Sequence, residues 1–155
     1  MDWSLFAIFF LACCGAAATG AMFPPGDWYR RLDKPVWTPP DWVFPIAWTA
    51  LYLGLAVAGA RVAPLEASAH AMAFWAMQIS FNALWTPVFF GLRRLGAAMV
   101  VLAVLWVAVA GLLLTLWPLD RLSFWIVSPY IVWVSYAGAL NLDIWRRNRG
   151  TAALA

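Results

Sequence analysis

Five long apolar stretches, each followed by proline, glycine or arginines, dominate this chain of 155 residues. They cover residues 4–23, 42–62, 67–90, 95–117 and 122–145, and a membrane-spanning helix needs about 20 such residues. Only 11% of the residues are charged, against about 25% in soluble domains, so the chain lacks polar side chains to cover an apolar core in water. The sequence predicts an all-α membrane protein, a single domain built as a five-transmembrane-helix bundle.

The ends of the stretches carry helix-ending signals. Gly91 and Pro118 are expected to end the third and fourth helices, because glycine favours helix ends and proline interrupts helical hydrogen bonds. Asp2 stands before the first stretch, where a cleaved signal peptide carries basic residues. We therefore expect the first helix to be retained.

The ten basic residues are unevenly divided between the two sides of such a bundle. Arg61 and Arg121 fall on one side, and eight fall on the other: Arg30, Arg31, Lys34, Arg93, Arg94, Arg146, Arg147 and Arg149. The positive-inside rule then places the first loop and the C-terminus in the cytoplasm. The clusters are short and form no basic stripe among exposed aromatics, so nucleic-acid binding is not expected.

The middle of the stretches is free of Lys, Arg, Asp, Glu and His. Ion-coupled transporters place ionisable groups there, and hydrolytic enzymes need them as acids and bases, so neither class is expected. Cys13 and Cys14 are adjacent and point about 100° apart on a helix, so they are expected to pack rather than to form a disulfide. His70 is the only histidine, and no metal site is predicted.

Three helix faces instead carry amide and aromatic side chains. They comprise Trp48 and Tyr52; Gln78, Asn82 and Trp85; and Tyr130, Trp133, Ala137 and Asn141. Spacings of three or four residues place the members of each set on one helix face. One interpretation is that the amides bind helices together, and the other is that the faces line a cavity for a flat ligand.

The first loop, residues 24–41, combines aromatic residues, cations and prolines. Its notable members are Trp28, Tyr29, Arg30, Lys34 and Trp37. Because prolines stiffen the segment, we expect a lid over the mouth of the bundle, with cations suited to ligand carboxylates. The alternative is an interfacial loop whose cations meet anionic lipid.

Small residues recur at four-residue spacing in the first two helices, at Ala12, Ala16, Gly20, Gly54 and Ala58. Such residues permit close helix packing, either within the bundle or between subunits.

Several sequence blocks resemble the TspO/MBR family, the translocator protein or peripheral-type benzodiazepine receptor group. The blocks extend from the end of the first helix to the tail, and they are Trp28 and Tyr29; Lys34 and Pro35; residues 37–42; residues 45–48; Leu51 and Tyr52; Gln78; residues 82–91; Pro129, Tyr130 and Trp133; Leu140 and Asn141; and Trp145 and Arg146. Their order and spacing together identify a bacterial-type member.

This resemblance implies a five-helix bundle, often a homodimer, that binds tetrapyrroles such as protoporphyrin IX and haem-related porphyrins. It also implies binding of isoquinoline-like and benzodiazepine-like ligands, and a role in porphyrin sensing, transport or regulation of tetrapyrrole metabolism. No cofactor is expected beyond porphyrin as ligand. The family's pocket positions match Trp48, Asn82, Trp133 and Ala137, with Trp85 nearby, and Tyr52, Gln78 and Asn141 on the same faces complete the predicted ligand site.

Two alternatives to a receptor follow from the same resemblance. Some bacterial members promote light-dependent porphyrin breakdown, and the two tryptophans implicated match Trp48 and Trp133, which would then be catalytic. Passive transport of porphyrins or other apolar ligands is the other alternative. The sterol-recognition pattern of animal members is broken, since Leu142 takes its tyrosine position and Tyr136 is too far from Arg146. We therefore expect weak cholesterol binding.

Overall fold

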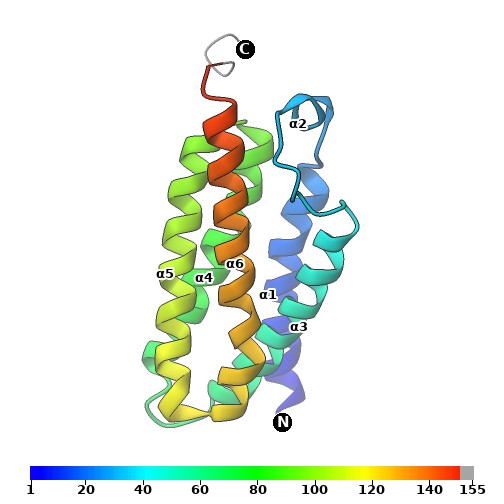
Figure 1. Ribbon diagram of the computed structural model, residues 1–155. Coiled ribbons are helices and arrows are strands. Elements are labelled where there is room, and N and C mark those ends of the chain that lie inside the picture. Colours follow the sequence, from blue (N-terminus) through cyan, green and yellow to red (C-terminus); the bar gives the residue numbers. More distant parts are fainter. Residues whose placement is uncertain (151–155) are drawn as a thin grey trace.

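A computed structural model describes residues 1–150, and every regular element in this part of the chain is helical. Figure 1 shows the long helices standing side by side in one bundle. In chain order the elements are α1 (Trp3–Met22), the short α2 (Asp27–Arg31), α3 (Val43–Val62), α4 (Ala69–Thr86), the π-helical turn η1 (Pro87–Gly91), α5 (Leu95–Leu119) and α6 (Arg121–Arg147).

Within residues 1–150, four helices are long and apolar enough to cross a membrane: α1, α3, α5 and α6. Their outer faces carry apolar side chains, and Leu114 of α5 and Val132 of α6 are 76% and 69% exposed. Such surfaces suit lipid rather than water. The prediction of an all-helical integral membrane protein is confirmed.

The helices pack as neighbouring pairs around a common interior. α4 and α6 flank α5, α1 lies against α3 and α4, and α3 also contacts α6. Glycines permit two close approaches, because a Cβ added at Gly59 of α3 would lie 2.7 Å from the ring of Phe9 of α1. A Cβ at Gly111 of α5 would likewise overlap the Phe74 ring of α4. A larger residue at either position would push the helices apart.

The two predicted helix ends have different outcomes. The helical run of α4 and η1 ends at Gly91, as predicted, but the left-handed residue after it is Arg93, with φ of 56°. Gly91 serves packing instead, since an added Cβ would lie 2.8 Å from the Phe23 ring. The prediction that Pro118 ends the fourth helix is wrong by one residue: α5 continues to Leu119. Proline removes only one backbone hydrogen-bond donor, so the helix continues past it for one residue. The backbone becomes extended at Asp120.

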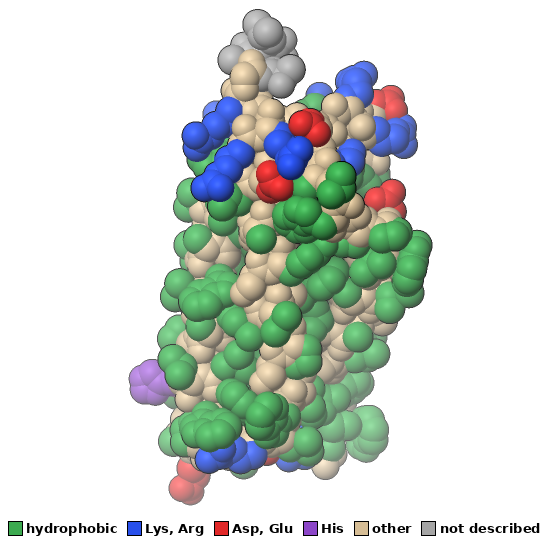
Figure 2. All heavy atoms as spheres, viewed as in Figure 1, with side chains coloured by type: hydrophobic (Ala, Val, Ile, Leu, Met, Phe, Trp, Pro, Cys, Tyr) green, Lys and Arg blue, Asp and Glu red, His purple; other side chains and the backbone are tan. Residues whose placement is uncertain are grey.

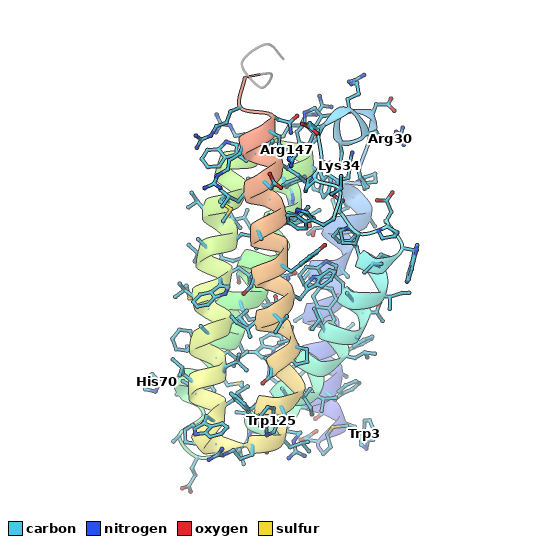
Figure 3. All side chains as sticks on the ribbon, in the orientation of Figure 1. Trp3, Arg30, Lys34, His70, Trp125 and Arg147 are labelled. Atoms are coloured by element: carbon cyan, nitrogen blue, oxygen red, sulfur yellow. The ribbon has the colours of Figure 1, made fainter. Side chains whose placement is uncertain are left out.

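The two ends of the bundle differ in charge. Lysine and arginine side chains gather where α2 and the C-terminal end of α6 lie (Figure 2), and we call this the lid end. Arg30, Lys34 and Arg147 lie there, whereas Trp3 and Trp125 lie at the opposite end (Figure 3).

An ion pair ties three helices together at the opposite end. Asp120 lies between α5 and α6, and its carboxylate accepts two hydrogen bonds from Arg61 of α3. The Nε of Arg61 donates over 2.8 Å and its Nη2 over 3.1 Å. These hydrogen bonds lower the pKa of Asp120 to about 2.

Candidate functional site

A cavity of about 440 Å³ lies inside the bundle beneath the first loop. Volumes of about 300–1,000 Å³ are typical of small-molecule sites. Its walls come from α1, α3, α4, η1, α5 and α6, and they are mostly aliphatic and aromatic.

Aromatic rings form much of the wall between α3 and α6. The Trp48 ring stacks on Tyr52, with centroids 5.4 Å apart, and meets Trp133 edge to face at 6.3 Å. Phe44 also packs edge to face against Trp133, with ring centroids 5.8 Å apart. Since each ring is held by another, the wall presents flat apolar surfaces in fixed orientations.

A chain of three polar side chains crosses the bundle at the same level. Tyr52 of α3 donates to Oδ1 of Asn82 over 2.6 Å, and Nδ2 of Asn82 donates to the Tyr130 hydroxyl over 2.8 Å. Asn82 and Tyr52 line the cavity, whereas Tyr130 is fully buried behind them. The amide of α4 is thus fixed by hydroxyls from α3 and α6, which holds three walls in register.

The first loop covers the cavity mouth, and its helix α2 contributes one residue to the lining. That residue is Tyr29, whose ring contacts Phe89 at 6.1 Å and Phe90 at 5.3 Å. Its burial raises the pKa of the Tyr29 hydroxyl. Farther along the loop, the Trp37 carbonyl accepts a hydrogen bond from Tyr136 of α6 over 2.8 Å. The loop is therefore fastened to η1 and α6.

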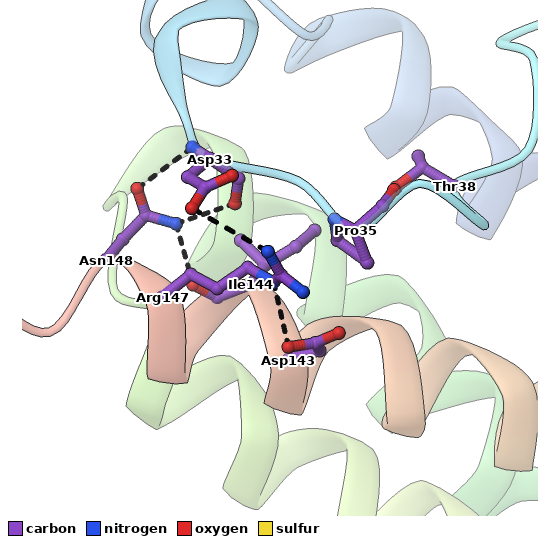
Figure 4. Close-up of polar contacts among 7 residues, drawn as sticks. All are labelled: Asp33, Pro35, Thr38, Asp143, Ile144, Arg147 and Asn148. Carbon is purple, nitrogen blue, oxygen red and sulfur yellow. Dashed lines mark hydrogen bonds and ion pairs between the residues drawn. The ribbon is translucent and has the colours of Figure 1, made fainter.

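A second fastening joins the loop to the C-terminal end of α6, as Figure 4 shows. The Asn148 side chain accepts from the Asp33 amide over 3.1 Å and donates to the Asp33 carbonyl over 2.9 Å. Arg147 pairs with Asp143 at 3.0 Å and lies 3.8 Å from the Asp33 carboxylate. Because Asn148 is only 6% exposed, these hydrogen bonds are shielded from water and hold the loop down.

Comparison of the sequence with known proteins shows which family the chain belongs to. The sequence model of the TspO/MBR family matches residues 6–146. The chain belongs to the TspO/MBR family.

Relatives in the TspO/MBR family cover nearly the whole chain. Protein CrtK of Rhodobacter capsulatus is 49% identical over 154 residues, 97% of this chain and 96% of the relative. The tryptophan-rich sensory protein of Cereibacter sphaeroides is 47% identical over 151 residues, covering 96% and 94%. The human translocator protein is 30% identical over 139 residues, covering 84% and 82%.

In this TspO/MBR bundle, the predicted ligand-binding residues divide into two groups. Those that line the cavity are Trp48, Tyr52, Asn82, Trp85, Trp133, Ala137 and Asn141. Gln78 lies one helical turn before Asn82, is fully buried and is not part of the lining. Neither atom of its amide has a hydrogen-bond partner among residues 1–150.

The cations predicted to face a ligand lie outside the cavity lining. Lys34 donates to the Tyr29 carbonyl over 2.8 Å and lies over the Tyr29 ring, while Arg30 pairs with Asp27 on the exposed side of α2. The lining includes an acidic residue instead, Asp41. The mouth of this TspO/MBR cavity therefore carries a negative charge.

Small residues of α1 form one wall of the cavity, and two of them, Ala16 and Gly20, were predicted to permit close helix packing. Ala16, Ala17, Gly20 and Ala21 line the cavity, and a Cβ added at Gly20 would meet nothing within 4 Å. The four-residue spacing was the available signal, but it does not distinguish close packing from space left for a ligand.

Proposed function

We propose that this protein is a membrane receptor for tetrapyrroles such as protoporphyrin IX, which bind in the cavity beneath the first loop. The observation that carries the proposal is the corner of Trp48 and Trp133 beside the fixed amide of Asn82. Flat rings suit a flat macrocycle, and an amide orients a polar ring substituent. A relative named as a tryptophan-rich sensory protein supports a role in sensing.

We propose further that the bundle crosses the membrane five times. α4 and η1 continue one another over 18 and 5 residues, a length of about 35 Å, which is enough to cross a hydrocarbon layer about 30 Å thick. Since α4 packs on α1 and α5, its amides are shielded from lipid. The basic lid end then faces the cytoplasm by the positive-inside rule.

Titration of the purified protein with protoporphyrin IX, in the dark and then in light, tests the receptor proposal. We expect a saturable shift of porphyrin absorbance in the dark, reversed by an isoquinoline-like competitor. A shift equal to that given by an unrelated membrane protein in the same detergent contradicts the proposal.

A light-dependent porphyrin-degrading enzyme is the second candidate, favoured by the two indoles that adjoin in the cavity wall. In that reaction both oxygen atoms of dioxygen would add across one carbon–carbon double bond of the macrocycle, which breaks into two carbonyl groups. An indole of Trp48 or Trp133 would donate an electron to the photoexcited porphyrin and recover it when the oxygen adduct opens. Illumination should bleach bound porphyrin in the wild type and much more slowly in Trp133→Phe. Equal bleaching rates in both proteins contradict the enzyme and leave the receptor intact.

The family resemblance also supports proposals of a homodimer, of passive porphyrin movement and of weak cholesterol binding. Sedimentation in detergent, porphyrin flux into proteoliposomes and sterol titration test them in turn.

A further inference from the structure

A second cleft lies at the lid end, between α2 and the turn that joins η1 to α5. Its volume is about 320 Å³, and its lining includes Trp28 and Arg31 of α2, Phe90 of η1, and Arg93 of the following turn. Phe90 also belongs to the lining of the larger cavity, so the two spaces are neighbours. Figure 2 shows basic side chains gathered at this end of the molecule, with acidic side chains among them.

Two arginines from separate segments supply the positive charge of this cleft. Within residues 1–150, Arg31 and Arg93 take part in none of the ion pairs and in no side-chain hydrogen bond. The lining also includes the acidic residue Asp27, whose carboxylate is paired with Arg30. The cleft therefore presents two guanidinium groups whose donors are available to an anion.

The backbone at Arg93 gives an independent reason to assign these side chains a role. Arg93 has φ of 56°, in the left-handed region that residues other than glycine rarely adopt. The turn is closed by backbone bonds from Leu92 to Pro87 and from Arg94 to Val88, so glycine at position 93 would form it with less strain. An arginine in a strained position suggests that its guanidinium is used.

The chemistry of the lining identifies the ligand class. Guanidinium groups bind phosphate through paired hydrogen bonds, while the Trp28 and Phe90 side chains offer apolar contact beside them. At the end of a membrane bundle, the groups that combine a phosphate with an apolar body are phospholipids. We propose that this cleft is a phosphate-binding site in which Arg31 and Arg93 bind the phosphate of an anionic phospholipid.

A phosphate held by both arginines would join α2 to the η1–α5 turn. It would act as another tether of the first loop, beside the Asn148 contacts with Asp33. The site is separate from the tetrapyrrole cavity, and the proposal does not depend on what that cavity binds.

Binding of short-chain lipids to the full chain in neutral detergent tests the site. The probes are dihexanoyl phosphatidylglycerol and inorganic phosphate, with binding counted by native mass spectrometry. Arg93→Gly should lower affinity for the lipid about tenfold, since one charge-assisted contact is lost. Arg94→Gln removes the same charge from a neighbouring residue outside the cleft lining, and its affinity should equal that of the wild type.

The glycine substitution also separates lost binding from lost folding. Because it removes backbone strain, Arg93→Gly should melt at the same temperature as the wild type or above it. Lipid affinity that is unchanged in both Arg93→Gly and Arg31→Gln overturns the proposal, and so does a wild type that binds neither probe. Competition by equimolar inorganic phosphate would support the phosphate site but assign it to soluble phosphate.

Discussion

The indoles of Trp48 and Trp133 meet edge to face, with centroids 6.3 Å apart and planes at 89°. They come from α3 and α6, which are far apart in sequence, and each contacts a further ring: Tyr52 stacks on Trp48 and Phe44 packs against Trp133. The corner is therefore held in place by packing among the protein's own side chains. Rigid aromatic walls of this kind lower the ordering cost of binding a flat molecule.

Filling the cavity from α1 should abolish binding without unfolding the bundle. Gly20 lines the cavity and has open space around it, so Gly20→Phe places a ring where the ligand would lie. We expect protoporphyrin affinity to fall at least tenfold and the melting temperature to stay within a few degrees. Gly15 is also on α1 with nothing within 4 Å of an added Cβ, but it is outside the lining. Gly15→Phe should therefore bind normally, and equal affinities for the two variants contradict the cavity assignment.

Removing the charge of Asp41 should strengthen binding of a dicarboxylate porphyrin. Asp41 lines the mouth of the cavity, where a carboxylate repels those of the ligand. At the intermediate dielectric of a protein surface, Asp41→Asn should raise protoporphyrin affinity about three- to tenfold. Protoporphyrin dimethyl ester is the control ligand, because it has no carboxylates. An equal gain for the ester shows that the effect is not electrostatic.

Replacing Gln78 with methionine should leave binding unchanged and stability equal or higher. The Gln78 amide is fully buried without hydrogen-bond partners among residues 1–150. Its replacement therefore removes a desolvation cost of about 1–3 kcal/mol that no hydrogen bond offsets. Asn82→Leu on the same helix should destabilise the bundle, because Tyr52 and Tyr130 lose their partner. Thermal unfolding in detergent distinguishes the two. A large loss of porphyrin affinity in Gln78→Met would contradict this prediction and show that Gln78 contributes to ligand binding.

Asp120→Asn should destabilise the protein at neutral pH and much less in acid. The pKa of Asp120 is about 2, below the ordinary 3.8, because of its bonds to Arg61. A depressed pKa contributes stability that is complete above pH 3.8 and is lost as the pH falls through 2, and a shift of this size is worth about 2 kcal/mol. The free energy of unfolding of the wild type and of Asp120→Asn, measured at pH 7 and below pH 3, checks this. A difference in unfolding free energy that is the same at both pH values contradicts a stabilising ion pair between Asp120 and Arg61.

Helical periodicity predicted the faces of the site but not its depth. Trp133, Ala137 and Asn141 share a face of α6, and all three line the cavity. The same spacing placed Gln78 and Asn82 together in the predicted site, yet the cavity lining on α4 begins at Asn82 and does not include Gln78. Periodicity gives the direction of a side chain around the helix axis. It does not give the length of the cavity along that axis, because that length depends on the neighbouring helices.

Loop contacts were beyond what the sequence alone reveals. Lys34 folds back onto the Tyr29 carbonyl, and Asn148 pairs with Asp33 over a separation of 115 residues. The Lys34 contact lies within the loop, whereas the Asn148 contact depends on how the loop packs on the C-terminal end of α6. The left-handed Arg93 is equally hidden, because sequence rules assign that conformation to glycine.

The most direct test of the account is a dark titration with protoporphyrin IX, followed by porphyrin absorbance, of the wild type, Trp48→Phe and Trp125→Phe. Trp48 lines the cavity, whereas Trp125 is 65% exposed and lies at the opposite end of the bundle. We predict saturable binding, an affinity about three- to tenfold lower in Trp48→Phe, and no change in Trp125→Phe. Saturable binding that is equal in all three proteins, or weakened only by Trp125→Phe, contradicts a ligand site built on the Trp48 and Trp133 corner.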